Sequence, residues 1–453
     1  MQFVLTKEYL STLSDAIERQ DKHYVRQMLD ELYAADIAEI LEELDFEEAK
    51  YVFTLLDGEE AADVLMELEE DVREDFLENI SSKDIAQRYV DNLDSDDAAD
   101  LISELPLSVR SEVLSHIEDE EQAANIADLL NYPEDTAGGL MAKELVKVNI
   151  NWTVTTCMRS IRKQAEEVEH FYVVYVVNDR NILQGIVSLK DIMLAPSKAR
   201  VEDIYDSDIH TVNATMDAEE VGSVMKKYDL VVVPVVDDLG RLLGRITFDD
   251  IVDVIKEEAD KDYQLMSGIS ESIETTDNLW ILSRARLPWL LVALLGGIVG
   301  SRVISIYEPQ IQIYPEMAFF MPLIAAMGGN VGVQSSALVV QGLANNSLSR
   351  DGIFPKLLKE FMVGLLNGLI CSALLLSYNV LFDHSMALSI TVSVALMTVI
   401  SFAAIFGTFV PLALDRFKID PALATGPFIT TSNDIVGLFI YFMIGRMMYG
   451  IFV

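Results

Sequence analysis

Five long apolar runs fill the last third of the chain. Each is long enough for a helix to cross about 30 Å of hydrocarbon, which takes roughly 20 residues. The runs predict five membrane helices, at residues 287–306, 315–344, 358–382, 386–414 and 422–448. The second run is longer than one crossing requires and contains Pro322 and the glycine-rich stretch Met327–Gln334. Its glycines and polar residues could line a pore, or they could allow close helix packing.

Short amphipathic helices are predicted over residues 1–130. Apolar residues recur every three or four positions in three similar segments, Ile37–Leu44, Ala61–Leu68 and Ala98–Leu105. This pattern gives each helix one buried stripe and one charged face. Because helix pairs of this size cannot bury a core alone, we expect them to stack as an α-helical solenoid.

Alternating strands and helices are predicted over 131–256, in two copies at about 131–195 and 196–256. The runs Phe171–Val177 and Leu230–Val236 are rich in β-branched residues, and a turn follows each. The first copy then has Gly185-Ile-Val-Ser-Leu-Lys-Asp191, and the second has Gly244-Arg-Ile-Thr-Phe-Asp-Asp250. This repeated Gly-x-x-Ser/Thr-x-x-Asp element resembles a tandem pair of CBS domains, which are α/β modules.

The resemblance to CBS domains implies candidate contacts for an adenine nucleotide such as ATP or AMP. They are Ser188, Asp191, Thr247 and Asp250. A purely local explanation is the alternative. Ser188 and Thr247 would cap helices, and the two aspartates would lie in the first helical turn, where the helix dipole favours an acid.

The segment 251–286 favours one long helix that leads into the first membrane run. We assign residues 257–286 to a connecting helix and 287–453 to the membrane domain. The expected fold is therefore a multidomain membrane protein with a helical solenoid, an α/β pair, a connecting helix and an all-α domain of five spans.

Asp434 is the only charged residue between Pro421 and Gly445, within the fifth apolar run. A carboxylate at the centre of a membrane costs about 3 kcal/mol on insertion scales and usually faces a bundle interior or a water-filled path. Polar residues that include Thr430 and Asn433 precede it. The stretch predicts a cation site, and a buried Asp hydrogen-bonded to a neighbouring helix is the alternative.

The formal charge of −40 is unevenly distributed. The chain has 73 acidic and 33 basic residues. Residues 287–453 hold eight of the acidic and seven of the basic residues, so the first 286 residues hold 65 acidic and 26 basic residues. Such an acidic region argues against nucleic acid as a partner and favours cations. The basic residues of the membrane region flank alternate loops, so we expect a cytoplasmic N-terminus and an extracytoplasmic C-terminus. The N-terminus shows no signal-peptide pattern, which agrees with this orientation in a cell membrane.

The order of these regions, together with the motifs Ala325–Ser336 and Thr425–Asp434, resembles the MgtE family of bacterial Mg²⁺ channels and transporters. The resemblance implies a homodimer with a cation path lined by the second and fifth spans. It implies that Asp434 lies in this path, with Gly328, Gly329 and Asn330 on the pore wall. Because Mg²⁺ dehydrates reluctantly, a few oxygen ligands that hold its water shell suit such a path.

The resemblance also implies that the acidic region senses cytoplasmic Mg²⁺ and closes the pore. Carboxylates that repel one another at low Mg²⁺ would be bridged when the ion binds. The implied ligands are Asp96, Asp100, Asp217, Glu219, Asp229, Asp250, Asp253, Glu258, Asp262 and Asp420. Lys261 lies where another acid would be expected.

Two other functions remain open from the residues alone. Asp434 could carry protons in a secondary transporter coupled to H⁺ or Na⁺, or the chain could be a membrane sensor without transport. An intramembrane enzyme is not expected. The sequence lacks the His-Glu-x-x-His pattern of zinc proteases, and none of its five histidines lies in an apolar run.

Overall fold

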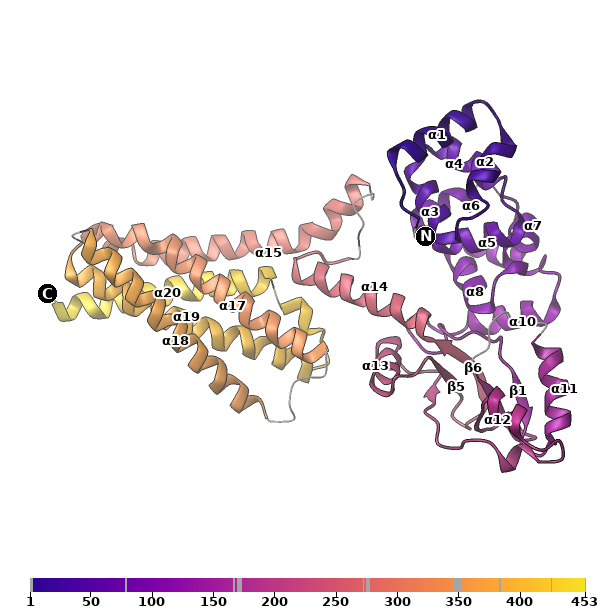
Figure 1. Ribbon diagram of the computed structural model, residues 1–453. Helices are drawn as coiled ribbons and strands as arrows, with labels where there is room; N and C mark the ends of the chain where they lie inside the picture. The colour runs from indigo at the N-terminus through magenta and orange to yellow at the C-terminus, as the bar shows by residue number, and fades with distance from the viewer. Residues whose placement is uncertain are drawn as a thin grey trace. The chain divides into compact units, whose positions relative to one another are not determined.

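The computed structural model describes residues 3–77, 80–165, 168, 173–271, 273, 278–344, 352–382, 384–424 and 426–452. The chain forms two compact units, Met1–Ile255 and Lys256–Val453 (Figure 1).

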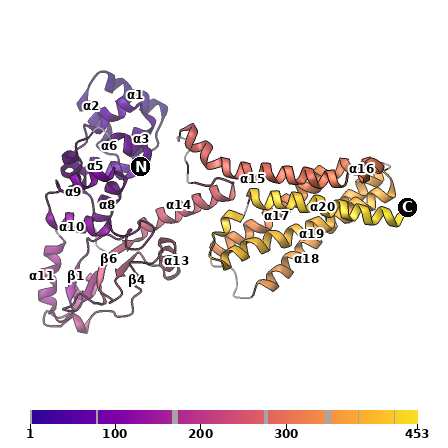
Figure 2. The same cartoon turned by 180° about the vertical axis from the view of Figure 1, so that it is seen from behind.

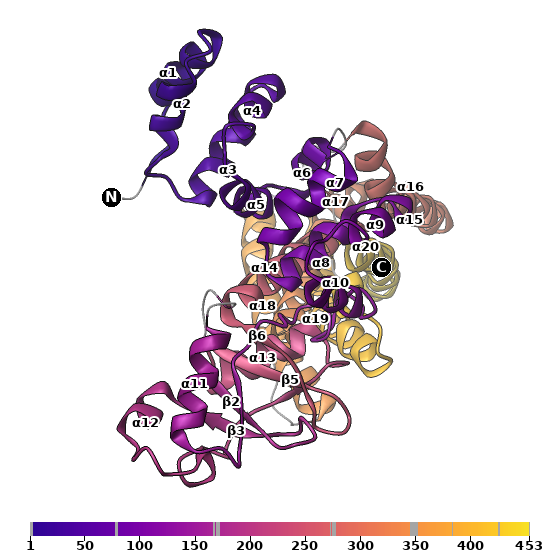
Figure 3. The same ribbon diagram turned by 90° about the vertical axis from the view of Figure 1, so that its right-hand side faces the viewer.

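Amphipathic helices build the first part of the N-terminal unit, and successive helix pairs stack side by side (Figure 3). The described helices are α1 (Lys7–Glu18), α2 (Lys22–Leu29), α3 (Ala34–Glu43), α4 (Phe46–Phe53), α5 (Gly58–Glu67), α6 (Glu70–Leu77), α7 (Ser82–Asp84), α8 (Ser95–Glu104), α9 (Leu107–Leu114) and α10 (Glu120–Leu129), with the π-helical turn η1 (Ile85–Tyr89) and the 3-10 turn η2 (Val90–Asn92). Thr6, Asp21, Asp57 and Asp119 cap helices by accepting a backbone N–H. The apolar stripes form one continuous core, so the helical solenoid is confirmed.

Two small sheets of the same topology follow. Their elements are β1 (Lys147–Asn149), α11 (Val154–Gln164), β2 (Val174–Val177), β3 (Leu183–Val187), α12 (Leu189–Leu194), the 3-10 turn η3 (Val201–Asp203), β4 (Val212–Asn213), α13 (Ala218–Tyr228), β5 (Val232–Val236), β6 (Leu242–Thr247) and α14 (Phe248–Met266). In each sheet the middle strand is parallel to the first and antiparallel to the third. Both hairpins have a register shift, after Val176 and after Val235. The predicted α/β repeat is confirmed, although residues 171–172 of its first run lie outside the described residues.

The equivalent glycines of the two repeats have a packing reason. A methyl group at Gly185 would collide with the backbone oxygen of Asp206. At Gly244 it would lie 2.7 Å from the backbone oxygen of Ala142. Each strand therefore accepts a neighbouring segment only because no side chain stands there.

The prediction of one helix over 251–286 is wrong. Helix α14 ends at Met266, and α15 begins at Leu279. Gly268 has a φ of +82°, a conformation that glycine adopts readily and that ends a helix. The Gln264 side chain then binds both backbone groups of Ile273, at 2.8 and 3.0 Å, so the chain turns back.

Five helices of the C-terminal unit are long and apolar enough to cross a membrane, among the residues that the structure describes. The elements of this unit after α14 are α15 (Leu279–Ile306), α16 (Glu308–Ile313), the 3-10 helix η4 (Pro315–Phe320), α17 (Met321–Ala344), α18 (Ile353–Leu381), α19 (Met386–Arg416), the 3-10 turn η5 (Pro421–Ala424) and α20 (Gly426–Phe452). The five predicted spans are confirmed. Helix α17 runs unbroken through its glycine-rich stretch.

Helix α19 is the most buried of the five, and α17, α18 and α20 pack against it. Helix α15 lies alongside α20 (Figure 2). Small residues permit these contacts. A methyl group at Gly407 of α19 would collide with the Gly332 oxygen of α17, and one at Gly296 of α15 would collide with Thr431 of α20.

Candidate ion path and cation-sensing sites

Asp434 lies on α20 where this helix crosses α17. Its carboxylate faces the glycine-rich stretch, because a methyl group added at Gly329 would lie 3.6 Å from Asp434 Oδ1 and 3.1 Å from Thr430 Cγ2. Asp434 is partly buried. The Thr430 hydroxyl donates to the Gly426 carbonyl at 3.0 Å, a bond within its own helix. The structure therefore brings Asp434, Thr430 and Gly329 together.

Asn433 and Asn330 lie in different environments. Asn433 is 1 % exposed and packs against Gly332 of α17, and neither polar atom of its amide has a partner among the described residues. Gly328 is also buried in this crossing, near the Asn433 backbone oxygen. Asn330 is exposed on the single chain. The buried glycines let α17 approach α20 closely, while Asn330 is available to solvent or to a partner.

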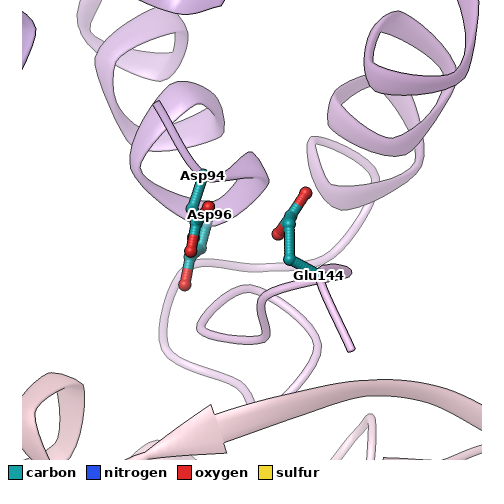
Figure 4. A group of neighbouring side chains, drawn as sticks. All are labelled: Asp94, Asp96 and Glu144. Carbon is teal, nitrogen blue, oxygen red and sulfur yellow. The ribbon is translucent and has the colours of Figure 1, made fainter. Parts of the chain in front are cut away.

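A group of three carboxylates lies at the start of α8. Oxygen atoms of Asp94, Asp96 and Glu144 all lie within 4.8 Å of one another. Asp94 and Asp96 lie side by side on the helix start, and Glu144 faces them from a neighbouring segment (Figure 4). One oxygen of Asp96, Oδ1, is buried without a hydrogen-bond partner in the described part of the chain. An unsatisfied carboxylate oxygen among acidic oxygens fits a hard cation such as Mg²⁺.

Three aspartates of α8 have raised pKa values. Burial and then the charges of Asp97 and Asp250 raise the pKa of Asp96 well above its usual range. Loss of hydration, followed by the Asp250 charge, raises the pKa of Asp97 to about 6. The pKa of Asp100 rises to about 7, chiefly through burial and the Asp97 charge. The shifts show that Asp96 and Asp97 lie within electrostatic reach of Asp250, which belongs to the second α/β repeat.

Ser95 joins the helical region to the first α/β repeat. Its hydroxyl donates to Glu144 Oε2 at 2.8 Å and accepts from the Lys143 N–H at 2.9 Å. Lys143 also pairs with Asp128 at 2.8 Å. The three carboxylates of Asp94, Asp96 and Glu144 therefore lie where the helical region contacts the first α/β repeat, within the N-terminal unit.

The four candidate nucleotide contacts form two local pairs. The Ser188 hydroxyl donates to Asp191 Oδ2 at 2.5 Å and caps α12. The Thr247 hydroxyl donates to Asp250 Oδ2 at 2.6 Å. Burial raises the pKa of Asp250 despite the two Thr247 hydrogen bonds that lower it. The two pairs match the local explanation, in which the aspartates and hydroxyls organise helix starts.

A second acidic group lies in the C-terminal unit. Glu258 and Asp262 are one turn apart on α14, and Asp420 precedes η5 and accepts from the Ala422 N–H at 2.8 Å. Partial burial raises the pKa of Asp262, and the charges of Asp420 and Glu258 add to the shift. Three predicted sensing residues from two separate segments are thus within electrostatic reach of one another.

Other predicted sensing residues are not gathered by a single chain. Asp217 accepts from the Glu219 N–H at 3.0 Å at the start of α13. Asp229 ends the same helix in a left-handed conformation, with a φ of 53°. Because α13 has 11 residues, its ends lie roughly 16 Å apart. Asp253 is exposed on α14.

Sequence reasoning missed Asp94, Asp97 and Glu144. Asp94 and Asp97 belong to the run Leu93–Asp97, whose acids are typical of a helix N-terminus and do not by themselves indicate a cation site. Glu144 stands in a segment without helical or strand periodicity, so no pattern connected it with α8. The Ser95 hydrogen bond and the closeness of its carboxylate to Asp94 and Asp96 show that relation.

The fold and these sites define a multispan membrane protein with an acidic soluble region. Family models match the chain at residues 321–444 (MgtE, divalent cation transporter), 32–135 (MgtE intracellular N domain), and 137–198 and 201–257 (CBS domain).

Curated relatives agree with these family matches. The magnesium transporter MgtE of Thermus thermophilus is 36 % identical over 327 residues, 72 % of each chain. That of Bacillus subtilis is 33 % identical over 314 residues, 69 % of this chain and 70 % of the relative. A crystal structure of the cytosolic domain of the Mg²⁺ channel MgtE with ATP matches with a TM-score of 0.50 and 32 % identity, covering 54 % of this chain and 99 % of the other. This chain belongs to the MgtE family of divalent cation transporters.

Proposed function

We propose that this protein imports Mg²⁺ through its membrane domain and that cytoplasmic Mg²⁺ closes the path. The observation that carries the proposal is the position of the Asp434 carboxylate, which faces Gly329 in the crossing of α17 and α20. A carboxylate held inside a membrane bundle needs a counter-charge, and a hydrated divalent cation supplies one. The names of the curated relatives support Mg²⁺ as that cation.

Residues of α17 and α20 would form the path. Asp434 would attract the ion, and Asn330 and Thr430 would contact its water shell. Gly328 and Gly329 would keep α17 and α20 close enough for backbone oxygens to contact the water shell of the ion as well. Asn433 would support the path indirectly, because its side chain fills the crossing of α17 and α20 next to Gly332. A transporter of this kind needs no catalytic residue, and we assign none.

The acidic groups would act as the sensor. With no cation, the carboxylates of Asp94, Asp96 and Glu144 repel one another, together with nearby Asp250. Mg²⁺ bound between them would replace that repulsion by attraction and hold the helical region against the α/β pair. Glu258, Asp262 and Asp420 would respond in the same way in the C-terminal unit. Asp100, Asp217, Glu219, Asp229 and Asp253 are further acids proposed for this role.

The test is Mg²⁺ flux into liposomes that hold the purified protein and a trapped Mg²⁺ dye. The variants are Asp434→Asn and, as a matched control, Glu308→Gln, which removes an exposed carboxylate on α16. We expect flux in the wild type and the control, at least tenfold less flux in Asp434→Asn as an order of magnitude for a lost charge site, and suppression by high Mg²⁺ on the cytoplasmic side.

The other outcomes separate the alternatives. Unchanged flux in Asp434→Asn would make this residue a structural aspartate and remove it from the path. Flux that follows an imposed pH or Na⁺ gradient would indicate a coupled secondary transporter. Folded protein without flux under any of these conditions would indicate a sensor that does not transport.

We further propose that the α/β pair binds ATP. The support is the ATP complex of the related cytosolic domain and the repeated Ser188–Asp191 and Thr247–Asp250 pairs. Titration of the purified protein with ATP would test this, with Thr247→Val as the variant. Equal heats for wild type and variant, or none for either, would contradict a role of this pair.

The proposed assembly is a homodimer in a cell membrane, with the N-terminus in the cytoplasm and the C-terminus outside. The family resemblance supports the dimer, and the charges of the loops support the orientation. Light scattering of the detergent-solubilised protein would test the dimer. Labelling of single cysteines placed near each terminus would test the orientation.

A further inference from the structure

Helices α11 and α12 lie next to each other in the first α/β repeat (Figure 3). An open groove of about 590 Å³ lies between α11 and the end of α12. Met158, Ile192 and Met193 give it an apolar lining, and the side chains of Arg159 and Arg162 line it as well. No acidic residue is among the lining residues that the structure describes. The groove therefore combines apolar side chains with two positive charges.

The second α/β repeat fills the equivalent place with its own helix. Helix α13 corresponds to α11, because both have 11 residues and both begin after a capping side chain. In this correspondence Gly222 stands where the first repeat has Met158. A methyl group at Gly222 would lie 3.2 Å from Ile251 Cγ2 and 3.5 Å from Ile255 Cγ1. Helix α14 reaches this place because it has 19 residues, whereas α12 has six.

The first repeat leaves the place open because α12 ends at Leu194. Pro196 stands at the position that corresponds to Ile255, and a proline disfavours the helical conformation of the residue before it. The Thr155 hydroxyl then donates to the Ser197 carbonyl at 2.9 Å, which ties the chain after α12 to the start of α11. The groove is therefore a built feature of the first repeat, with walls that its own hydrogen bonds hold in place.

The charge around the groove is opposite in sign to that of the surrounding region. Helix α11 has three basic residues and no acidic residue, and residues 189–200 have three basic residues and one acidic residue. Residues 1–286 as a whole have 26 basic and 65 acidic residues. Arg159 and Arg162 lie three positions apart on α11, so they share one face of the helix. Both are exposed, and neither makes a hydrogen bond or ion pair within the described part of the chain. The groove therefore attracts an anion.

We propose that this groove binds a nucleoside diphosphate, with its phosphates on Arg159 and Arg162 and its base against Met158 and Met193. Arginine forms charge-assisted hydrogen bonds with phosphate oxygens. Methionine sulfur makes favourable contacts with aromatic rings. A nucleoside diphosphate matches both features, because it offers one phosphate for each guanidinium and a flat base for the thioether side chains.

The groove is separate from the ATP contacts proposed above. Ser188 and Asp191 bond to each other at the start of α12, and neither lines the groove. Thr247 and Asp250 belong to the second repeat. The inference goes beyond Mg²⁺ import and uses neither the ion path nor the acidic sensing groups.

The test is isothermal titration calorimetry of the full-length protein in detergent with ADP, in EDTA so that no Mg²⁺ complex forms. The main variant carries Arg159→Gln and Arg162→Gln. The matched control carries Lys226→Gln and Lys227→Gln, which remove the same charge from exposed positions of α13, the equivalent helix of the second repeat.

We expect the affinity of the groove for ADP to fall at least about tenfold in the arginine double variant, because charge-assisted hydrogen bonds are lost. The lysine double variant should bind ADP like the wild type. Met193→Glu, which adds a negative charge to the wall, should also weaken binding. Equal affinity in the wild type and the arginine double variant, or no binding to the wild type, would overturn the proposal. Inorganic phosphate or pyrophosphate bound as tightly as ADP would indicate an adventitious ion only and would also contradict it.

Thr247→Val separates this groove from the proposed ATP contacts. ADP binding that persists in Thr247→Val and falls in the arginine double variant supports the groove. ADP binding that is lost in Thr247→Val and intact in the arginine double variant would assign the nucleotide to the Thr247–Asp250 pair and overturn this inference. Because the titration contains no Mg²⁺, its result and that of the flux assay can fail independently.

Discussion

The Ser95 hydroxyl donates to the Glu144 carboxylate at 2.8 Å, and this bond joins α8 to the segment before β1. Ser95 is fully buried, and it also accepts from the Lys143 N–H. One side chain thus positions a carboxylate of the candidate cation site and satisfies a backbone donor of the neighbouring domain.

Ser95→Ala should destabilise the soluble region by about 1–3 kcal/mol, the cost of leaving buried hydrogen-bond partners unsatisfied. Chemical denaturation followed by circular dichroism would measure the loss. The variant should also reduce the stabilisation that Mg²⁺ gives, because Glu144 loses the contact that orients it. Ser111→Ala, a change on α9 outside this contact, is the control. A full Mg²⁺ effect in Ser95→Ala would contradict the positioning role.

The stability of the metal-free soluble region should fall as the pH rises from about 4 to 8. The pKa values of Asp97 and Asp100 are raised in the folded chain, to about 6 and about 7. Between the unfolded value of about 4 and these values, the folded chain binds more protons than the unfolded chain, so the free energy of unfolding decreases with pH.

Thermal unfolding in EDTA at several pH values would measure this slope. The double variant Asp97→Asn, Asp100→Asn should flatten it, whereas Asp75→Asn, at an exposed position on α6, should not. Mg²⁺ should raise the stability most at high pH, where both carboxylates are charged. A wild type whose stability rises with pH in EDTA would contradict the assignment.

Glu360 of α18 accepts a hydrogen bond from the Ser335 hydroxyl of α17 at 3.2 Å. Ser335 is 5 % exposed, so its hydroxyl has little access to solvent. Glu360→Leu should destabilise the membrane domain by about 1 kcal/mol, within the range of hydrogen bonds measured between membrane helices. Glu360→Gln keeps an acceptor and should stay close to the wild type. Thermal denaturation in detergent would measure both, and equal melting of the two variants would show that the bond contributes nothing.

Gly332→Ala should separate α17 from α20. The added methyl group would collide with the Asn433 amide nitrogen and lie 2.7 Å from Ile429 Cγ2. Overpacking of this kind costs about 1–3 kcal/mol. Gly297→Ala is the control, since a methyl group there meets nothing within 4 Å. Thermal stability and Mg²⁺ flux should both fall in Gly332→Ala alone, and normal flux would show that the crossing tolerates a wider spacing.

The sequence predicted the regular parts of the fold because periodicity determines them. The five apolar runs, the helical repeats and the two copies of Gly-x-x-Ser/Thr-x-x-Asp each correspond to elements of the structure. The end of α14 at Met266 was not predicted. The helix ends because Gly268 takes a positive φ, and the spacing of charged and apolar residues does not indicate this conformation. Composition alone cannot show that a glycine takes a positive φ.

Some residues of the candidate sites could be predicted from the sequence, and others could not. Asp434 was identifiable because a charge in an apolar run is rare. Glu144 was not, because its importance depends on Ser95, a residue 49 positions earlier. In an acidic chain the sequence names many possible ligands, and only the folded contacts select among them.

The meeting of Met266 and Gly426 has a consequence for the evolution of this chain. At Gly426 a methyl group would collide with the Met266 backbone oxygen of α14, whereas at Gly268 it would collide with ring atoms of Pro427 of α20. A substitution at Gly426 therefore cannot be accommodated by a change of one opposing side chain, and the positive φ angles of both glycines disfavour other residues. Within close relatives these two positions should be retained or replaced together, and they should tolerate less variation than the acidic residues beside them.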